Sequence, residues 1–195
     1  MSFAVIVAML GTVLLVWAAV QDVRRGKVPV VAGFGMLMLG LAVLIQQSLY
    51  LWAAYFVVAI WCSRGGAWRA VFVAASLVVM WLYGWDALPI VLGVLFVSTL
   101  FWMKWFGGGD AQLAMGLIGI GHDWLVLGML FGLTIVVGIV LTMIRRGGVV
   151  EGAKRLSWVA SHLGEPADAE AIHTPWGIVA AVAGVTYLWL WALVL

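Results

Sequence analysis

Long hydrophobic runs that contain no charged residue alternate along this chain with short polar stretches. The charge-free runs include residues 1–21, 28–63, 124–144 and 174–195. Each run reaches the roughly 20 residues that a helix needs to cross the hydrocarbon core of a bilayer. The run over 28–63 is long enough for two passages, because three polar residues, Gln46, Gln47 and Ser48, interrupt it near its middle.

Together with shorter apolar stretches, the pattern predicts about eight transmembrane helices. We place them at about residues 2–20, 29–46, 49–63, 67–83, 87–104, 109–121, 124–144 and 175–195. Helices satisfy their own backbone hydrogen bonds in lipid, whereas open strands do not, and the alternating pattern of a membrane barrel is absent. We therefore expect an all-α, polytopic membrane protein whose residues 1–195 form one integral-membrane domain.

Composition and charge support this class and suggest an orientation. The chain is 66% hydrophobic and 9% charged, with 13 tryptophans, which is far from the balance of soluble domains. With eight helices, every basic residue falls on the same side, which the positive-inside rule makes cytosolic. These residues are Arg24, Arg25, Lys27, Arg64, Arg69, Lys104, Arg145, Arg146, Lys154 and Arg155. We accordingly expect both termini outside, and residues 145–174 as a cytosolic loop.

The residues that usually bind metals or act in nucleophilic catalysis are sparse. Cys62 is the single cysteine, so the chain has no CxxC pair, and it has no HExxH motif either. The three histidines, His122, His162 and His173, have no spacing that suggests a catalytic triad. We expect no metal, no cofactor and no nucleic-acid partner.

Two of the eight acidic residues differ from the rest in their position. Six lie in predicted loops, where solvation explains them: Asp86, Asp123, Glu151, Glu165, Asp168 and Glu170. Asp22 and Asp110 instead lie at the cytosolic ends of predicted membrane helices. The stretch from Asp110 to the outer turn at Gly121 is only 12 residues long, about 18 Å of helix, so Asp110 is expected below the membrane surface. Asp22 is expected nearer the interface, where Arg24 and Arg25 offer ion pairing as an alternative.

Gly107, Gly108 and Gly109 precede Asp110. Glycine permits backbone angles that other residues avoid, and it lets a second backbone come close to the aspartate. A flexible turn is the alternative.

Two carboxylates in one poorly hydrated site cannot both ionise easily, so the pKa of one rises and that of the other falls. Such a pair provides a base that activates water and an acid that protonates a leaving amine, which is the chemistry of peptide hydrolysis.

Three patches resemble the type IV prepilin peptidases, a family of GxGD aspartic proteases of membranes. They are QDVRRGKVP at 21–29, FGGGDAQLAMG at 106–116 and TPWGIVAAVAG at 174–184. The resemblance implies that Asp22 and Asp110 are catalytic. It also implies substrate-binding or structural roles for Pro29, Gly107, Gly108, Gly109, Gln112, Pro175 and Gly177.

The resemblance further implies an aspartic endopeptidase that removes the basic leader of prepilin-like, single-helix membrane proteins at the cytosolic face of the inner membrane. The methyltransferase insertion of larger members is absent. Val30 and Gln112 depart from the family, which commonly has asparagine and lysine at these positions. The chain between Asp22 and Asp110 is also longer than in typical members, which suggests an added helix pair. A non-catalytic membrane protein of pilus or secretion assembly, or a small proton-coupled transporter, remains as an alternative.

Overall fold

The computed structural model describes residues 2–62, 68–102, 107–132, 136 and 176–194, and these form helices and short turns without a strand. The α-helices are α1 (Phe3–Arg25), α2 (Val30–Gln46), α3 (Tyr50–Cys62), α4 (Trp68–Tyr83), α5 (Leu88–Trp102), α6 (Gly108–Gly121) and α9 (Trp176–Val194). A short 3₁₀ helix, η1 (Gly84–Ala87), joins α4 to α5, and residues 124–132 are also helical. The expectation of an all-helical chain is confirmed for this part.

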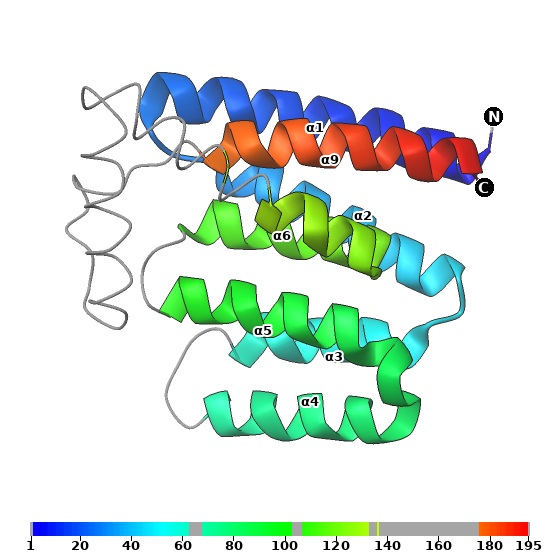
Figure 1. The fold of residues 1–195 in the computed structure, drawn as a ribbon. Coiled ribbons are helices and arrows are strands. Elements are labelled where there is room, and N and C mark those ends of the chain that lie inside the picture. The colour runs from blue at the N-terminus through cyan, green and yellow to red at the C-terminus, as the bar shows by residue number, and fades with distance from the viewer. Residues whose placement is uncertain (1, 63–67, 103–106, 133–135, 137–175, 195) are drawn as a thin grey trace.

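The helices lie side by side in one bundle, and helices that follow one another along the chain run in opposite directions (Figure 1). At one end α1 finishes, while α2, α6 and α9 begin. We call this end, which contains Asp22 and Asp110, the aspartate end. At the opposite end, which we call the far end, α1 begins, α9 finishes, and the turn at His122 and Asp123 follows α6.

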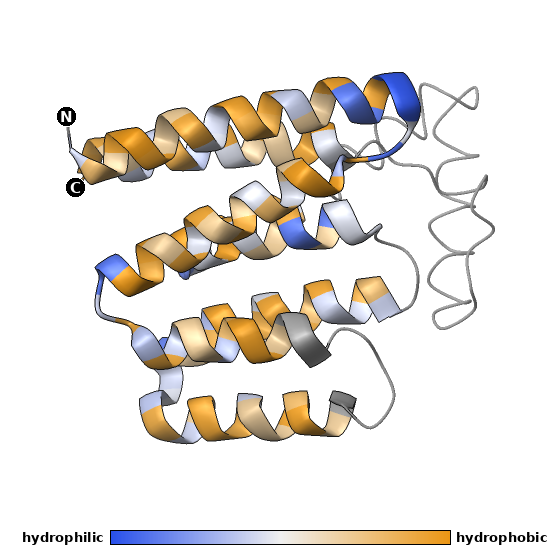
Figure 2. Ribbon diagram, turned by 180° about the vertical axis from the view of Figure 1, so that it is seen from behind, coloured by the Kyte–Doolittle hydropathy of each residue, from blue (hydrophilic) through white to orange (hydrophobic). Residues whose placement is uncertain are grey.

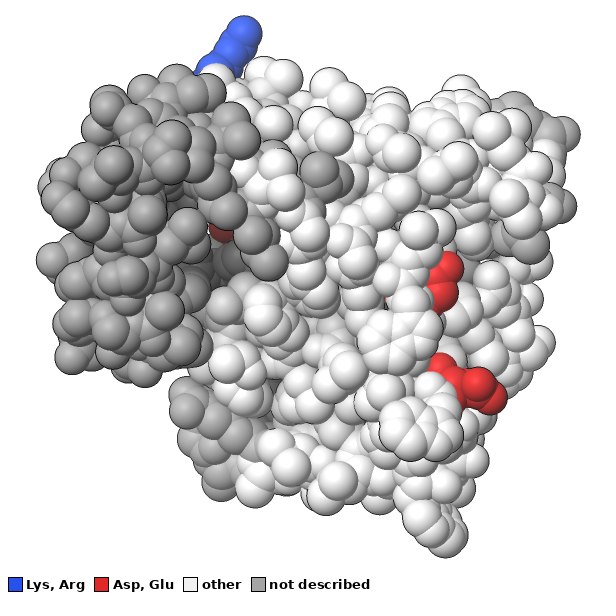
Figure 3. Space-filling model, viewed as in Figure 1, with Lys and Arg blue, Asp and Glu red and all other residues white. Residues whose placement is uncertain are grey.

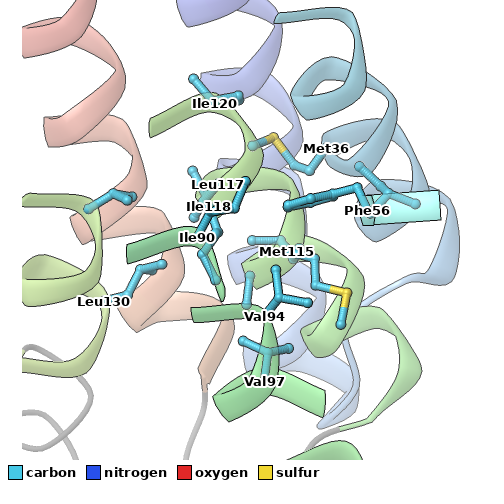
Figure 4. Packing of buried hydrophobic residues seen from close by; sticks show 14 of the residues in the cluster. Met36, Phe56, Ile90, Val94, Val97, Met115, Leu117, Ile118, Ile120 and Leu130 are labelled. Carbon is cyan, nitrogen blue, oxygen red and sulfur yellow. The ribbon is translucent and has the colours of Figure 1, made fainter. Parts of the chain in front are cut away.

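Helix α6 is the central helix of the bundle. Its sequence from Ala111 to Gly121 carries no charge and is apolar on all sides, which is the pattern of a helix surrounded by protein. Nearly every residue of this segment is buried, and Leu113, Leu117 and Ile118 are fully enclosed. Figure 4 shows α6 side chains packing with residues of neighbouring helices, among them Met36, Phe56, Ile90 and Val94.

Helices α2 and α6 pack in parallel, backbone against backbone, and this is the most extensive helix contact in the described part of the chain. A Cβ added to Gly40 would lie 2.7 Å from the Gly116 carbonyl oxygen, and one added to Gly116 would collide with the backbone of Met36. Small residues at such positions are typical of helix pairs in membranes, because they let two backbones approach closely. This packing fixes the axial position of α6 relative to α2.

The outer surface of the bundle is strongly apolar. Val13 on α1, Leu77 on α4 and Leu193 on α9 are 66%, 66% and 80% exposed, which would be costly in water. Hydrophobic positions cover most of the helical surface in Figure 2, and charged groups lie toward the two ends of the face in Figure 3. Among the described residues, three helical stretches, Phe3–Arg25, Ala70–Trp102 and Gly177–Val194, are long and apolar enough to cross a membrane.

These observations are consistent with a membrane protein. The stretch Ala70–Trp102 folds back at η1, so that α4 and α5 run in opposite directions (Figure 1). Val30–Gln46 and Tyr50–Ala59 are apolar but shorter. The number of eight transmembrane helices and the location of both termini outside the cell stay predictions. The expected loop over residues 145–174 lies outside the described residues.

The first helix is longer than its apolar run predicted. We expected it to end near residue 20, but α1 continues to Arg25, where Gly26 adopts the left-handed conformation (φ 66°) and donates its backbone N–H to the Asp22 carbonyl over 2.8 Å. Glycine in this conformation is a common helix C-cap. Asp22 therefore lies inside the helix, one turn before its end, with its side chain turned into the bundle.

Candidate functional site

The Asp22 side chain is buried and held by α9. Only 3% of the residue is exposed, and its Oδ2 accepts a hydrogen bond of 2.8 Å from the backbone N–H of Gly177. Gly177 lies in the first turn of α9, where backbone N–H groups lack partners within the helix and carry partial positive charge. A buried carboxylate at this position is thus stabilised by a hydrogen bond and by the end of a helix dipole.

The Asp110 carboxylate also accepts a hydrogen bond at a helix start, but at the start of its own helix. Asp110 is the third residue of α6, and its Oδ2 accepts a hydrogen bond of 3.1 Å from the backbone N–H of Gly107, the residue that precedes the helix. The carboxylate therefore caps the start of α6. Asp110 is half-buried, whereas Asp22 is fully buried, so the protein itself encloses Asp22 more completely than Asp110.

The structure brings the two aspartates to the same end of the bundle. Asp22 lies in the last turn of α1, and Asp110 lies in the first turn of α6. They come from helices that share no extensive direct contact; α2 and α9 bridge α1 to α6. The convergence of two acids that are far apart along the chain is therefore a product of the tertiary fold.

Of the three glycines before Asp110, Gly109 is the one that the packing requires. A Cβ at Gly109 would lie 2.5 Å from the carbonyl oxygen of Val28, in the connection between α1 and α2. Gly107 has an ordinary φ of −70°, and nothing lies within 4 Å of a Cβ built on Gly108. The close approach of a second backbone thus explains Gly109, while unusual backbone angles explain none of the three.

Pro29 and Gln112 lie around this contact. Pro29 precedes the first residue of α2, and its carbonyl accepts hydrogen bonds from Ala32 and Gly33, so it fixes where α2 starts. Gln112 faces Gly33: a Cβ on Gly33 would lie 3.1 Å from Gln112 Oε1 and 2.6 Å from the carbonyl oxygen of Gly109. The Gln112 Oε1 is buried and accepts no hydrogen bond.

The remaining predicted residues fall in different places. Gly177 contacts Asp22 directly, because a Cβ at Gly177 would lie 2.9 Å from the Asp22 Cβ. Arg24 and Arg25 are exposed at the end of α1, and Val30 is 62% exposed at the start of α2. Pro175 lies outside the described residues.

Two residues at the site were missed by the sequence analysis. Val28 supplies the carbonyl that Gly109 approaches, and Gly33 allows α2 to approach the first turn of α6. Gly33 and Gly40 recur at a spacing of seven on α2, as do Gly109 and Gly116 on α6. This spacing places small residues on one face of each helix and could have indicated that the two helices pack together.

Comparisons of the chain with protein-family models, with curated proteins and with solved structures each find no match. Two carboxylates lie at one end of an apolar bundle, and each accepts a hydrogen bond from a backbone N–H at a helix start. No group of three or more metal-ligating side chains occurs among the described residues.

Proposed function

We propose that the chain is an aspartic endopeptidase of the membrane, with Asp22 and Asp110 as its catalytic residues. The observation that carries the proposal is the placement of these two acids, from α1 and α6, at the same end of the bundle. Isolated ionisable residues are costly in membrane helices, and those that occur are usually functional. A pair on separate helices, with its own backbone donors, is an arrangement suited to acid and base catalysis.

The proposed reaction uses one aspartate as the base and the other as the acid. The ionised carboxylate takes a proton from a water molecule, and the oxygen of that water attacks the carbonyl carbon of the peptide bond. The protonated carboxyl group donates a hydrogen bond to the carbonyl oxygen as it becomes negative. The tetrahedral intermediate then collapses, the C–N bond breaks, and a proton passes to the leaving amine. The products are a new carboxyl terminus and a new amino terminus.

The substrate class that fits this site is a single-helix membrane protein with a basic leader, of the prepilin type. The aspartates lie at the end of the bundle, so a peptide bond just beyond an apolar helix can reach them while that helix stays in the bilayer. Arg24, Arg25 and Lys27 are exposed at the same end, and the positive-inside rule would place that end at the cytosol. The enzyme would then work at the cytosolic face of the inner membrane.

A reconstituted cleavage assay tests this proposal. The purified protein in lipid nanodiscs is incubated with peptides that join a lysine-rich leader, a glycine and an apolar helix. We expect one cut at the junction, incorporation of ¹⁸O from labelled water into the new carboxyl terminus, and a rate unchanged by EDTA. Absence of cleavage across the peptide panel, combined with proton uptake into vesicles that is lost in Asp110→Asn, would favour a transporter instead.

A further inference from the structure

A second carboxylate contact fixes α9 at the far end of the bundle. The Tyr187 hydroxyl donates a hydrogen bond of 3.1 Å to Asp123 Oδ2, and Tyr187 is only 2% exposed. The other oxygen of Asp123 accepts a hydrogen bond of 2.9 Å from Val126 N–H, at the start of the helix over residues 124–132. The Tyr187 ring packs directly on Gly121, where a Cβ would lie 2.8 Å from the ring Cζ.

Helix α9 is therefore held by one carboxylate at its start and by another about two turns before its end. Asp22 of α1 accepts the Gly177 N–H, and Asp123, just after α6, accepts the Tyr187 O–H. Ten residues, about 15 Å of helix, separate these two points on α9. The segment between these two points also packs closely on both neighbouring helices. A Cβ at Gly184 would lie 2.7 Å from Leu15 of α1 and 3.0 Å from Leu117 of α6.

This arrangement links the helices of the two aspartates. Asp110 belongs to α6 and Asp22 to α1, and these helices share no extensive direct contact, whereas α9 packs on both. In a closely packed interior, an axial shift of α9 relative to α6 is transmitted to whatever α9 holds. Resting on the proposed function, we propose that Tyr187 and Asp123 are positioning residues for the aspartate pair, which keep the Gly177 amide against Asp22 from the far end of the bundle.

Two simpler roles would account for the same contact. Asp123 could serve only as the N-cap of the helix over 124–132, or Tyr187 could contribute only to general stability. Both roles predict that exchange at Gly177 accelerates no more than it does after an equal loss of stability elsewhere in the bundle. Positioning predicts a change at Gly177 itself, across the bundle from the substituted residue.

The test uses three substitutions in the full chain. Tyr187→Phe removes the hydroxyl and keeps the ring. Asp123→Ser keeps an oxygen that can cap the following helix but is too short to reach Tyr187. Tyr55→Phe is the matched control, because Tyr55 is equally buried and its hydroxyl is hydrogen-bonded to Ser76 over 3.0 Å, between α3 and α4.

The main readout is the Gly177 amide in protein labelled with ¹⁵N-glycine. We expect its hydrogen exchange to accelerate about fivefold in Tyr187→Phe and in Asp123→Ser. A fivefold change in rate corresponds to the loss of one hydrogen bond of about 1 kcal/mol. We expect no further acceleration in the double variant and none in Tyr55→Phe. Exchange at Gly177 that is equal in Tyr187→Phe, Asp123→Ser and Tyr55→Phe would overturn the proposal.

The cleavage assay separates this inference from the proposed function. If the chain cleaves peptide, Tyr187→Phe should lower kcat about threefold to tenfold with KM unchanged, because Tyr187 is remote from the substrate. Cleavage that is intact in Tyr187→Phe but lost in Asp110→Asn would reject positioning and leave the peptidase in place. If no variant cleaves, the peptidase proposal fails, and the Gly177 amide still decides whether Tyr187 and Asp123 position α9.

Discussion

The backbone N–H of Gly177 donates a hydrogen bond of 2.8 Å to the carboxylate of Asp22, although 155 residues separate the two along the chain. This contact joins the first helix to the last at the aspartate end, where Asp110 also lies. Because the donor belongs to the start of α9, the carboxylate also benefits from the helix dipole. The site is thus assembled by three helices, of which two supply acids and one supplies a donor.

Gly177→Ala should strongly reduce peptide cleavage. The added methyl group would lie 2.9 Å from the Asp22 Cβ and 3.0 Å from Oδ2, so it displaces the carboxylate by several tenths of an ångström or more. A displacement of about 1 Å can lower a rate about 100-fold. Gly128→Ala is the control, since nothing lies within 4 Å of a Cβ there. Equal kcat values for Gly177→Ala and Gly128→Ala would refute the assigned contact.

Neighbouring glycines before Asp110 should respond differently to the same substitution. Gly109→Ala directs a methyl group at the Val28 carbonyl, 2.5 Å away, and should destabilise the fold by about 1–3 kcal/mol. Gly108→Ala meets open space and should leave the unfolding temperature close to that of the wild type. Thermal unfolding in detergent compares the two variants, and the packing account is wrong if Gly108→Ala is the more damaging.

Two glycines on α2 offer a similar comparison. A Cβ at Gly33 would lie 2.6 Å from the backbone carbonyl of Gly109, whereas one at Gly35 would lie 3.0 Å from the end of the flexible Leu14 side chain. Backbone yields less readily than a side-chain terminus, so Gly33→Ala should lower stability and activity, while Gly35→Ala should be tolerated. Unfolding temperatures and kcat/KM for both variants provide the measurement. If Gly33→Ala were tolerated, the close contact between the backbones of α2 and α6 at Gly33 would not be required for stability or activity.

His122 should make stability depend on pH. Burial lowers the pKa of His122 below its ordinary value of 6.5, while the charge of Asp123 acts in the opposite direction. The unfolded chain therefore takes up a proton at higher pH than the folded chain does. Stability from His122 is complete above about pH 6.5 and decreases as the pH falls below it, until the folded His122 is protonated as well.

His122→Asn should flatten this dependence between about pH 5 and 7. Asparagine tolerates the left-handed backbone of this position, where φ is 37°, and it does not titrate in this range. The variant loses the edge-to-face contact with Trp52, so it should be less stable at neutral pH. The measurement is the unfolding temperature of both proteins across this pH range. Parallel curves for the wild type and His122→Asn would show that His122 is not the source of the pH dependence.

Local patterns in the sequence predicted most of the helices, because each hydrophobic run is bounded by polar residues or glycine. The start of α6 was predicted to within one residue, because the glycines from Gly107 to Gly109 and Asp110 separate two apolar stretches. The end of α1 was missed, because the charged residues after residue 20 were taken to lie beyond the helix. Gly26, which follows two basic residues, is the C-cap signal that could have corrected it.

The candidate site was only partly visible in the sequence. Asp22 and Asp110 could be singled out, because each lies at the end of a predicted membrane helix and both fall on the same predicted side. Their actual partners could not, because the contact of Asp22 with Gly177 and that of Gly109 with Val28 depend on which helices become neighbours. Side-chain packing across the bundle determines which helices become neighbours. The periodicity of a single sequence does not specify these neighbours.

The most direct test of the account is the kcat/KM of peptide cleavage by Asp22→Asn and Asp110→Asn, with Asp86→Asn as control. Asp86 is exposed in η1 at the far end of the bundle, so its substitution removes a carboxylate without touching the site. We predict that Asp22→Asn and Asp110→Asn each lose at least about 1000-fold, because neither acid alone can act as both base and acid. Asp86→Asn should match the wild type. Substantial cleavage by either Asp22→Asn or Asp110→Asn would contradict the proposed aspartate pair.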